Sequence, residues 1–98
     1  MVVVIDLLGS RLRATRALVP DLSAKELDRL AALSPGHTTM IELGYRPRVE
    51  ARTALALADV LGISLDWLLR GSGRSPSPRT VRAAVARARL VAARCSAA

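Results

Sequence analysis

Helix-stopping residues occur at short intervals along this chain, and they limit the length of every element that it can form. Gly44, Gly62 and Gly71 each follow a run rich in apolar residues, and Pro20 follows the first such run. Glycine often ends a helix because it adopts the left-handed conformation without strain. No run of alternating apolar and polar residues is long enough to build a sheet. The pattern therefore predicts a chain of short helices.

Cap signals predict where these helices begin and end. Ser23 and Glu26 have the spacing of a capping box, in which each side chain accepts a hydrogen bond from the other residue's backbone N–H. Ser34-Pro35 and Ser77-Pro78 share another start signal, because serine caps a helix and proline suits its first position. The expected helices span about residues 6–18, 24–32, 35–43, 50–61, 65–70 and 78–94.

The near absence of aromatic residues restricts the core. Tyr45 and Trp67 are the only aromatic residues among 98, and Phe is absent, although 51% of the residues are hydrophobic. Leu, Val, Ile and Ala must therefore fill the core, with Trp67 as an anchor, and this composition favours packed helices. We expect an all-α domain over residues 1–72, and a linker plus a basic C-terminal helix or tail over residues 73–98.

The positive charge is distributed unevenly. Fifteen Lys and Arg residues against eight Asp and Glu residues give a formal net charge of +7. Residues 1–74 carry +2, and residues 75–98 carry +5, with five arginines and no acid. Such an excess suits nucleic acid or an anionic surface, and arginine pairs well with phosphate. A GC-rich coding sequence would also raise the arginine content, so both explanations stay open.

The last predicted helix has only a thin apolar stripe, formed by Val81, Val85, Ala88 and Ala92. It could be a dimerisation arm, a basic tail that strengthens DNA binding, or a disordered segment. Its arginines would repel those of a close parallel copy. We therefore favour a helix that docks on the domain or on DNA.

Several function classes lack the residues that they need. Cys95 is the only cysteine, so no internal disulfide can form, and a metal site is not expected. Met1–Leu8 is apolar but far shorter than the ~20 residues that span a membrane, so we expect a cytoplasmic protein without a membrane partner. No glycine-rich phosphate loop and no Ser-His-Asp motif occurs. We expect neither an enzyme nor a cofactor.

Two short helices around a break at Ala32-Leu33-Ser34 form a helix-turn-helix candidate. The stretch LSAKELDRLAALSPGHTTMIELG resembles the helix-turn-helix of phage repressors (the Cro and lambda-repressor type) and their bacterial relatives. LGSRLRATRAL is similar to the family's first helix, and LADVLGISLDWLLRG to its closing helices, so the match covers residues 7–72. The resemblance implies a five-helix domain that binds operator DNA as a dimer, with its third helix in the major groove.

The resemblance also implies which side chains face the groove. Family members often have Gln, Arg, Ser or Asn there, which form paired hydrogen bonds with base edges. In this chain, His37 and Thr39 would hydrogen-bond to bases or phosphate, and Met40 would contact a thymine methyl group. Pro35 and Gly36 offer little beyond their backbone. The groove-facing positions are Pro35, Gly36, His37, Thr39 and Met40.

Residues beside the third helix are the expected phosphate contacts. Arg46 and Arg48 lie in the loop that follows it, a loop that runs beside the DNA backbone in this family. Tyr45 would add a hydroxyl contact. Lys25 stands near the start of the second helix, where the helix dipole also attracts phosphate.

Two further positions have structural roles by the same resemblance. Arg16 and Glu42 stand where the family often has an arginine on its first helix and a glutamate near the end of its third. The resemblance implies an ion pair between them, whereas two independent surface charges are the alternative. Thr38 stands where isoleucine is usual, which predicts a slightly weaker core.

These features predict a DNA-binding transcriptional regulator, most simply a repressor, from a bacterium or phage and associated with the nucleoid. A homodimer would read a palindromic operator with half-sites about 34 Å apart. The alternative is a protein-interaction module, such as an antitoxin or anti-repressor partner with weakened DNA reading, because the third helix is poor in polar side chains. A non-specific nucleoid binder is a third hypothesis.

Overall fold

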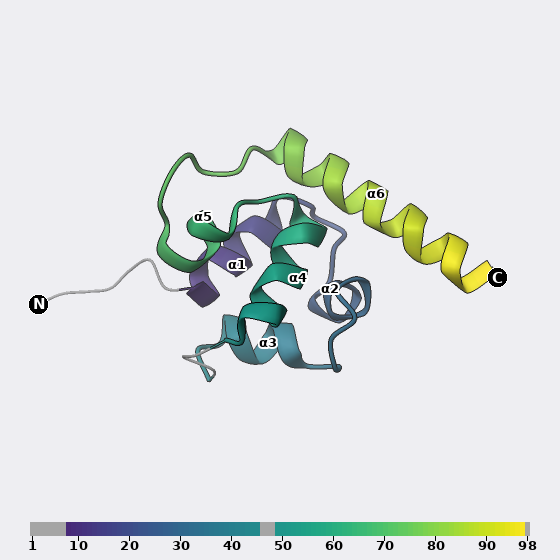
Figure 1. Ribbon diagram of the computed structural model, residues 1–98, viewed down its shortest axis with the longest axis horizontal. Helices are drawn as coiled ribbons and strands as arrows, with labels where there is room; N and C mark the ends of the chain where they lie inside the picture. The colour runs from purple at the N-terminus through teal and green to yellow at the C-terminus, as the bar shows by residue number, and fades with distance from the viewer. Residues whose placement is uncertain (1–7, 46–48, 98) are drawn as a thin grey trace, which may run out of the picture.

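The computed structural model describes residues 8–45 and 49–97, and every regular element over these ranges is a helix (Figure 1). This confirms the predicted all-α class. None of the described helices has both the length and the hydropathy that a bilayer crossing requires. The helices are α1 Leu8–Ala17, α2 Ala24–Leu30, α3 His37–Glu42, α4 Ala51–Leu61, α5 Leu65–Arg70 and α6 Pro78–Ala97.

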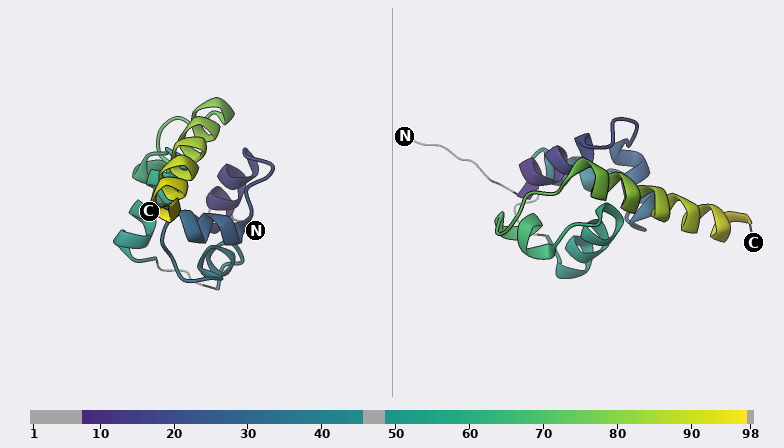
Figure 2. Two further views of the ribbon diagram at one scale, coloured as in Figure 1. Left: turned by 90° about the vertical axis from the view of Figure 1, so that its right-hand side faces the viewer. Right: turned by 90° about the horizontal axis from the view of Figure 1, so that it is seen from above.

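The helices pack as a small bundle with one long helix laid across it. α3 packs against α1 and α2 at one edge, and α4 packs against α5 and α6. Figures 1 and 2 place α6 at the opposite edge from α3, and its C-terminal end extends past the other helices. The two edges therefore present different surfaces.

Most helix ends follow the local cap signals. Ser64 and Ser77 accept hydrogen bonds from backbone N–H groups in the first turns of α5 and α6, at 3.0 and 3.2 Å. Gly62 and Gly71 end α4 and α5 with φ of 66° and 71°, in the left-handed region. These caps join residues three or four positions apart, so the sequence alone predicts them.

The predicted start of the third helix is wrong. α3 begins at His37, and Ser34-Pro35 forms a turn before it, in which the His37 N–H donates to the Ser34 carbonyl at 3.1 Å. Gly36 stands at the N-cap with φ of 90°, a conformation that cannot continue a helix. The Asp28 carboxylate accepts hydrogen bonds from the N–H groups of Gly36 and Thr38, so a side chain from α2 replaces the predicted serine cap.

The predicted capping box at the start of α2 forms only in part. Ser23 Oγ accepts a hydrogen bond from the Glu26 N–H at 3.0 Å. The Glu26 carboxylate instead binds the guanidinium of Arg89 from α6, at 2.9 and 2.8 Å. A bidentate arginine–carboxylate pair is stronger than one hydrogen bond from a neutral N–H, which explains why the Glu26 carboxylate binds Arg89 and not the Ser23 N–H.

The core consists of aliphatic side chains, as the composition predicts. Leu68, and not the half-buried Trp67, is the fully buried residue of α5. Arg11 also reaches into the interior, where its Nε and Nη2 donate to the carbonyls of Leu68 and Leu69 at 2.9 and 2.8 Å. The largest fully buried apolar residues are Leu12, Leu27, Ile41, Leu57, Leu61, Leu68, Val81 and Val85.

The apolar contact between α6 and the bundle lies in the first half of the helix. Val81 and Val85 are fully buried, whereas Val91 in the second half is 55% exposed. Arg82 Nε donates to the Leu18 carbonyl at 3.0 Å, which adds a polar tie to the apolar contact. Residues 78–97 thus form a helix that docks on the domain, whereas a role of this helix in dimerisation or in DNA binding stays a prediction.

Gly9 allows α1 and α3 to approach closely. A Cβ atom at this position would overlap the carbonyl oxygen of Ile41 and lie 3.2 Å from that of Glu42. Both atoms belong to the backbone of the last turn of α3, so they cannot rotate away as a flexible side chain would. The position of α3 against α1 therefore depends on the absence of a side chain at residue 9.

We expect Gly9→Ala to destabilise the protein, although alanine is the better helix former. Overpacking costs about 1–3 kcal/mol, and a clash with backbone atoms falls in the upper part of that range, about 2–3 kcal/mol. Helix propensity would favour alanine by about 1 kcal/mol, so we expect a net loss of about 1–2 kcal/mol. Urea unfolding monitored by circular dichroism measures it. Ser10→Ala, on the exposed neighbour in the same helix, should change stability by less than about 0.5 kcal/mol. A Gly9→Ala variant as stable as the wild type would contradict the close approach.

The Arg89–Glu26 pair predicts that α6 docking weakens in acid. Hydrogen bonds from Arg89 hold the pKa of the Glu26 carboxyl below its usual value. The carboxylate therefore stabilises the fold fully above the usual pKa of about 4.3, and this contribution is lost as the pH falls through the lowered pKa. Glu26→Gln should lower the free energy of unfolding near pH 7, and the two proteins should converge in acid. A difference that stays constant in urea titrations across this pH range would contradict the prediction.

Candidate nucleic-acid interface

α2 and α3 are joined by a tight turn at the break that the sequence indicates. Ala32 adopts φ of 58°, the only positive φ among the described non-glycine residues. The Leu33 N–H donates to the Asp28 carbonyl at 2.8 Å, which closes the end of α2. This left-handed residue redirects the chain, so that α3 starts only a few residues after α2 ends.

Asp28 connects α2 to the beginning of α3. Its side chain is buried, and Oδ1 accepts hydrogen bonds from the Thr38 N–H at 2.8 Å and from the Thr38 hydroxyl at 2.6 Å. Oδ2 accepts a hydrogen bond from the Gly36 N–H at 2.9 Å. The negative charge also lies where the dipole of α3 favours it. Three hydrogen bonds on one carboxylate thus hold the first turn of α3 against α2.

Thr38 is therefore more than a weakened core residue. It is fully buried, and its hydroxyl has a charged partner, so no polar group is left unpaired at this site. Isoleucine at this position would leave Asp28 with one acceptor site unused.

Asp28 was not among the residues singled out from the sequence. The available signal was an acid within the apolar stripe of α2, between Leu27 and Ala31. A buried carboxylate needs hydrogen-bond donors, so its place in the stripe indicates a partner elsewhere in the chain.

Arg16 and Glu42 are brought together as the resemblance implies. Arg16 Nε and Nη2 donate to the two carboxylate oxygens of Glu42 at 2.8 and 3.0 Å, and Nη1 donates to the Leu22 carbonyl at 2.9 Å. The hydrogen bonds to Glu42 raise the pKa of Arg16. This pair holds the last turn of α3 against α1, while Asp28 holds its first turn against α2.

With both ends held, α3 turns one face inward and the other outward. Thr38 and Ile41 are buried, whereas Thr39, Met40 and Leu43 are exposed. Met40 is 38% exposed and Leu43 is 59% exposed. No charged side chain lies among these exposed residues of α3.

The other predicted groove-facing residues lie around the start of α3. Pro35 and Gly36 are exposed in the turn, and His37 is half-buried in the first turn of the helix. Lys25 is exposed on α2, and it lines a groove of about 410 Å³ together with Pro35. The structure therefore brings Lys25 and the α2–α3 turn together on one surface.

The residues after α3 are described in part. Tyr45 is 69% exposed directly behind the helix. Arg46 and Arg48 lie outside the described residues. Arg52, which the sequence analysis did not single out, is exposed in the first turn of α4, shortly after that loop.

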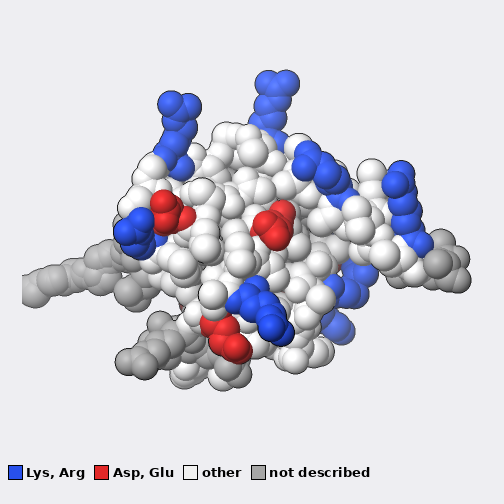
Figure 3. Space-filling model, in the orientation of Figure 1, with Lys and Arg blue, Asp and Glu red and all other residues white. Residues whose placement is uncertain are grey.

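Most arginines of the C-terminal segment lie away from α3. Figure 3 shows cationic side chains along the upper edge and right-hand end of the molecule, the region that α6 and the linker before it occupy in Figure 1. Because α3 lies at the opposite edge, a straight duplex that contacts α3 does not reach this row. Arginines of α6 are therefore poor candidates for extending an interface centred on α3.

Comparisons with protein-family models, with curated proteins and with solved structures find no match for this chain. Its function is therefore inferred from its own residues and their arrangement.

The buried hydrogen bonds of Asp28 predict a large and coupled effect of substitution. Asp28→Ala leaves two N–H groups and one hydroxyl without acceptors, and we expect a loss of about 3 kcal/mol in the free energy of unfolding. Thr38→Val removes the hydroxyl and should cost about 1 kcal/mol. Because valine has no hydroxyl to leave unpaired, the double variant should lose about 1 kcal/mol less than the sum. Urea titration of all four proteins measures this coupling, and strict additivity would contradict the prediction.

Proposed function

We propose that this chain is a DNA-binding transcriptional regulator, most simply a repressor, that places α3 in the major groove in the manner of the phage-repressor helix-turn-helix family. One observation carries the proposal. α3 is held at its first turn by a buried polar contact with α2 and at its last turn by a half-buried ion pair with α1, while Thr39 and Met40 on its other side remain exposed.

The dimensions of α3 suit this role. An α-helix with its side chains is about 10–12 Å across, and the major groove is about 12 Å wide. The Thr39 hydroxyl would hydrogen-bond to a base or a phosphate, and Met40 would contact a thymine methyl group. Base reading would therefore depend on few contacts, and its sequence specificity would be modest.

The surroundings of α3 would supply the phosphate contacts. Lys25 and Pro35 line one groove, so Lys25 shares a surface with the turn that leads into α3. Tyr45 is exposed behind the same helix. Two copies in a homodimer would place their α3 helices in successive major grooves, about 34 Å apart, on a palindromic site.

A protein-interaction module is the second candidate, and one observation favours it. Met40 on the exposed side of α3 and Leu43 directly after the helix are apolar, and no charged side chain lies among Thr39, Met40 and Leu43. Base-reading helices usually present arginine, glutamine or asparagine there, whereas apolar side chains suit a protein partner.

A matched pair of substitutions tests the DNA proposal. Thr39→Glu places a negative charge on the outward side of α3, and Ala83→Glu places one on the exposed side of α6. Each lowers the formal net charge of +7 by one unit, so long-range attraction to DNA changes equally. We expect Thr39→Glu to weaken binding to DNA selected from a random pool by at least about tenfold, and Ala83→Glu by less than about threefold. Fluorescence anisotropy at two salt concentrations measures both.

A non-specific DNA binder and a protein-interaction module would give different results in this test. Equal losses in the two variants would indicate non-specific attraction through net charge. No salt-sensitive binding by the wild-type chain would remove the DNA proposal and leave the interaction module.

A further inference from the structure

The apolar stripe of α6 continues beyond the part that is buried. Val81, Ala84 and Val85 are at most 8% exposed where α6 packs on the bundle. One and two turns further on, the same side of the helix carries Ala88, with Val91 and Ala92 after it. These residues occur where α6 begins to extend past the other helices, so the chain itself covers them only in part.

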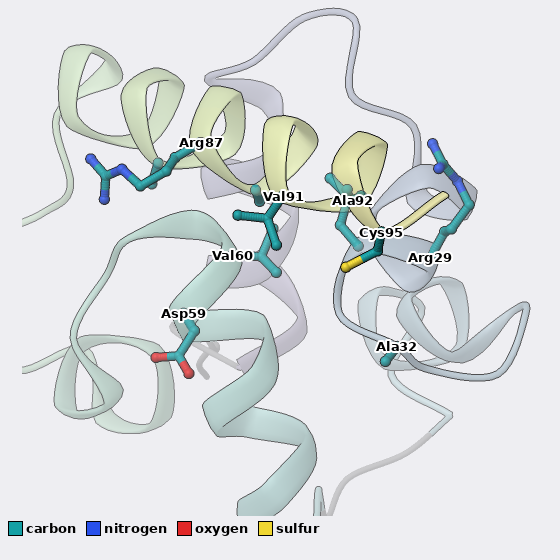
Figure 4. Close-up of a pocket in the computed structure, with 11 residues that line it drawn as sticks. Arg29, Ala32, Asp59, Val60, Arg87, Val91, Ala92 and Cys95 are labelled. Atoms are coloured by element: carbon teal, nitrogen blue, oxygen red, sulfur yellow. The ribbon is translucent and has the colours of Figure 1, made fainter. Parts of the chain in front are cut away.

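A groove of about 600 Å³ lies beside this uncovered half of α6 (Figure 4). Leu30 and Val60 form its other apolar wall, from α2 and α4. Figure 4 shows Val91 and the Cys95 sulfur directed toward the space between α6 and these helices. The groove has room for several apolar side chains, and a helix placed there would extend the packing that α6 already makes with α4.

The charges around the groove favour an acidic occupant. Arg29 and Arg87 line it, against the single acid Asp59, and Arg29 also has an exposed ion pair with Glu26 at 3.7 Å. Arg87 is exposed and has no ion pair with any residue that the structure describes. Asp59 makes a uniformly acidic occupant unfavourable and selects one whose acids lie toward the two arginines.

A second copy of this chain fits the groove less well. α6 carries five arginines and no acid, so two α6 helices side by side would place like charges next to each other. A foreign helix with acidic flanks has no such repulsion. Its apolar side would fill the groove while its carboxylates reach the rim.

We propose that this groove, lined by α6, α2 and α4, docks an amphipathic helix of a protein partner that carries acidic residues beside its apolar stripe. The occupant would bury Val91 and Leu30 and pair with Arg87 and Arg29. None of the groove residues belongs to the proposed DNA-contacting set, so this proposal does not depend on DNA binding. A chain that binds DNA through α3 could hold such a partner at the same time.

The test uses the full chain and a fluorescent synthetic peptide of about 18 residues, long enough to form a helix. The peptide has leucine at i, i+3, i+4 and i+7 spacing and glutamate beside that stripe, and its matched form has lysine in place of glutamate. We expect saturable binding of the glutamate peptide at micromolar protein, and binding of the lysine peptide at least about tenfold weaker. Bound glutamate peptide should also slow the alkylation of Cys95, which lines the groove.

Substitutions on α6 provide matched controls. Val91 lines the groove and Leu90 is the exposed neighbour that does not, at 55% and 60% exposure. Val91→Asp should weaken peptide binding at least about tenfold, and Leu90→Asp should leave it unchanged. Arg87→Glu should weaken it several-fold, and Arg79→Glu, which makes the same charge change away from the groove, should not. Since all four positions are exposed, circular dichroism should show the wild-type melting curve for each variant.

Three results would overturn the proposal. One is the absence of saturable binding, and another is equal weakening by Val91→Asp and Leu90→Asp. The third is a dimer in sedimentation analysis that Val91→Asp converts to a monomer, because a second copy would then occupy the groove.

Discussion

The position of α3 depends on the hydrogen bonds that the Asp28 carboxylate accepts. α3 has six residues, too few to be stable alone, and its N-cap Gly36 has no side chain to satisfy the free N–H groups. A buried acceptor from α2 satisfies two of them and the Thr38 hydroxyl. Because the carboxylate would be costly to bury unpaired, the contact ties the two helices to one mutual arrangement. The outward side of α3 follows from that arrangement.

Arginines make several of the remaining ties between helices. Arg11 donates to carbonyls at the end of α5, Arg16 pairs with Glu42 on α3, and Arg89 joins α6 to Glu26 on α2. The planar guanidinium group provides several donors at fixed angles, which suits it to bridging elements at their ends. Part of the positive charge is therefore structural, and the formal net charge overstates the cations available to a polyanion.

The molecule presents two surfaces of different chemistry. On the α3 side, the exposed residues that the structure describes on the helix, Thr39 and Met40, carry no charge, and Lys25 shares a groove with the turn before it. The α6 side combines a row of cations with an apolar groove. The two surfaces adjoin at Arg29, which lines both the groove beside α6 and the groove beside Lys25, so substitutions on α6 and on α3 themselves address each surface separately.

The sequence by itself determined the all-helical class, the aliphatic core and most helix ends. Those features follow from residue type or from contacts three or four positions apart, such as the caps Ser64 and Ser77. Within the candidate site it also indicated the turn after α2 and, through the resemblance, the Arg16–Glu42 pair.

Only the tertiary structure decided the start of α3 and the partner of Glu26. Asp28 accepts from residues 8 and 10 positions away, and Arg89 reaches Glu26 across 63 positions. Local signals pointed to Ser34 as the cap of α3 and to the Ser23 N–H as the partner of the Glu26 carboxylate. Charge-assisted contacts took both places once the helices packed, whereas the Ser23 hydroxyl still accepts from the Glu26 N–H. The groove beside α6 likewise exists only because three helices meet there, so no local pattern contains it.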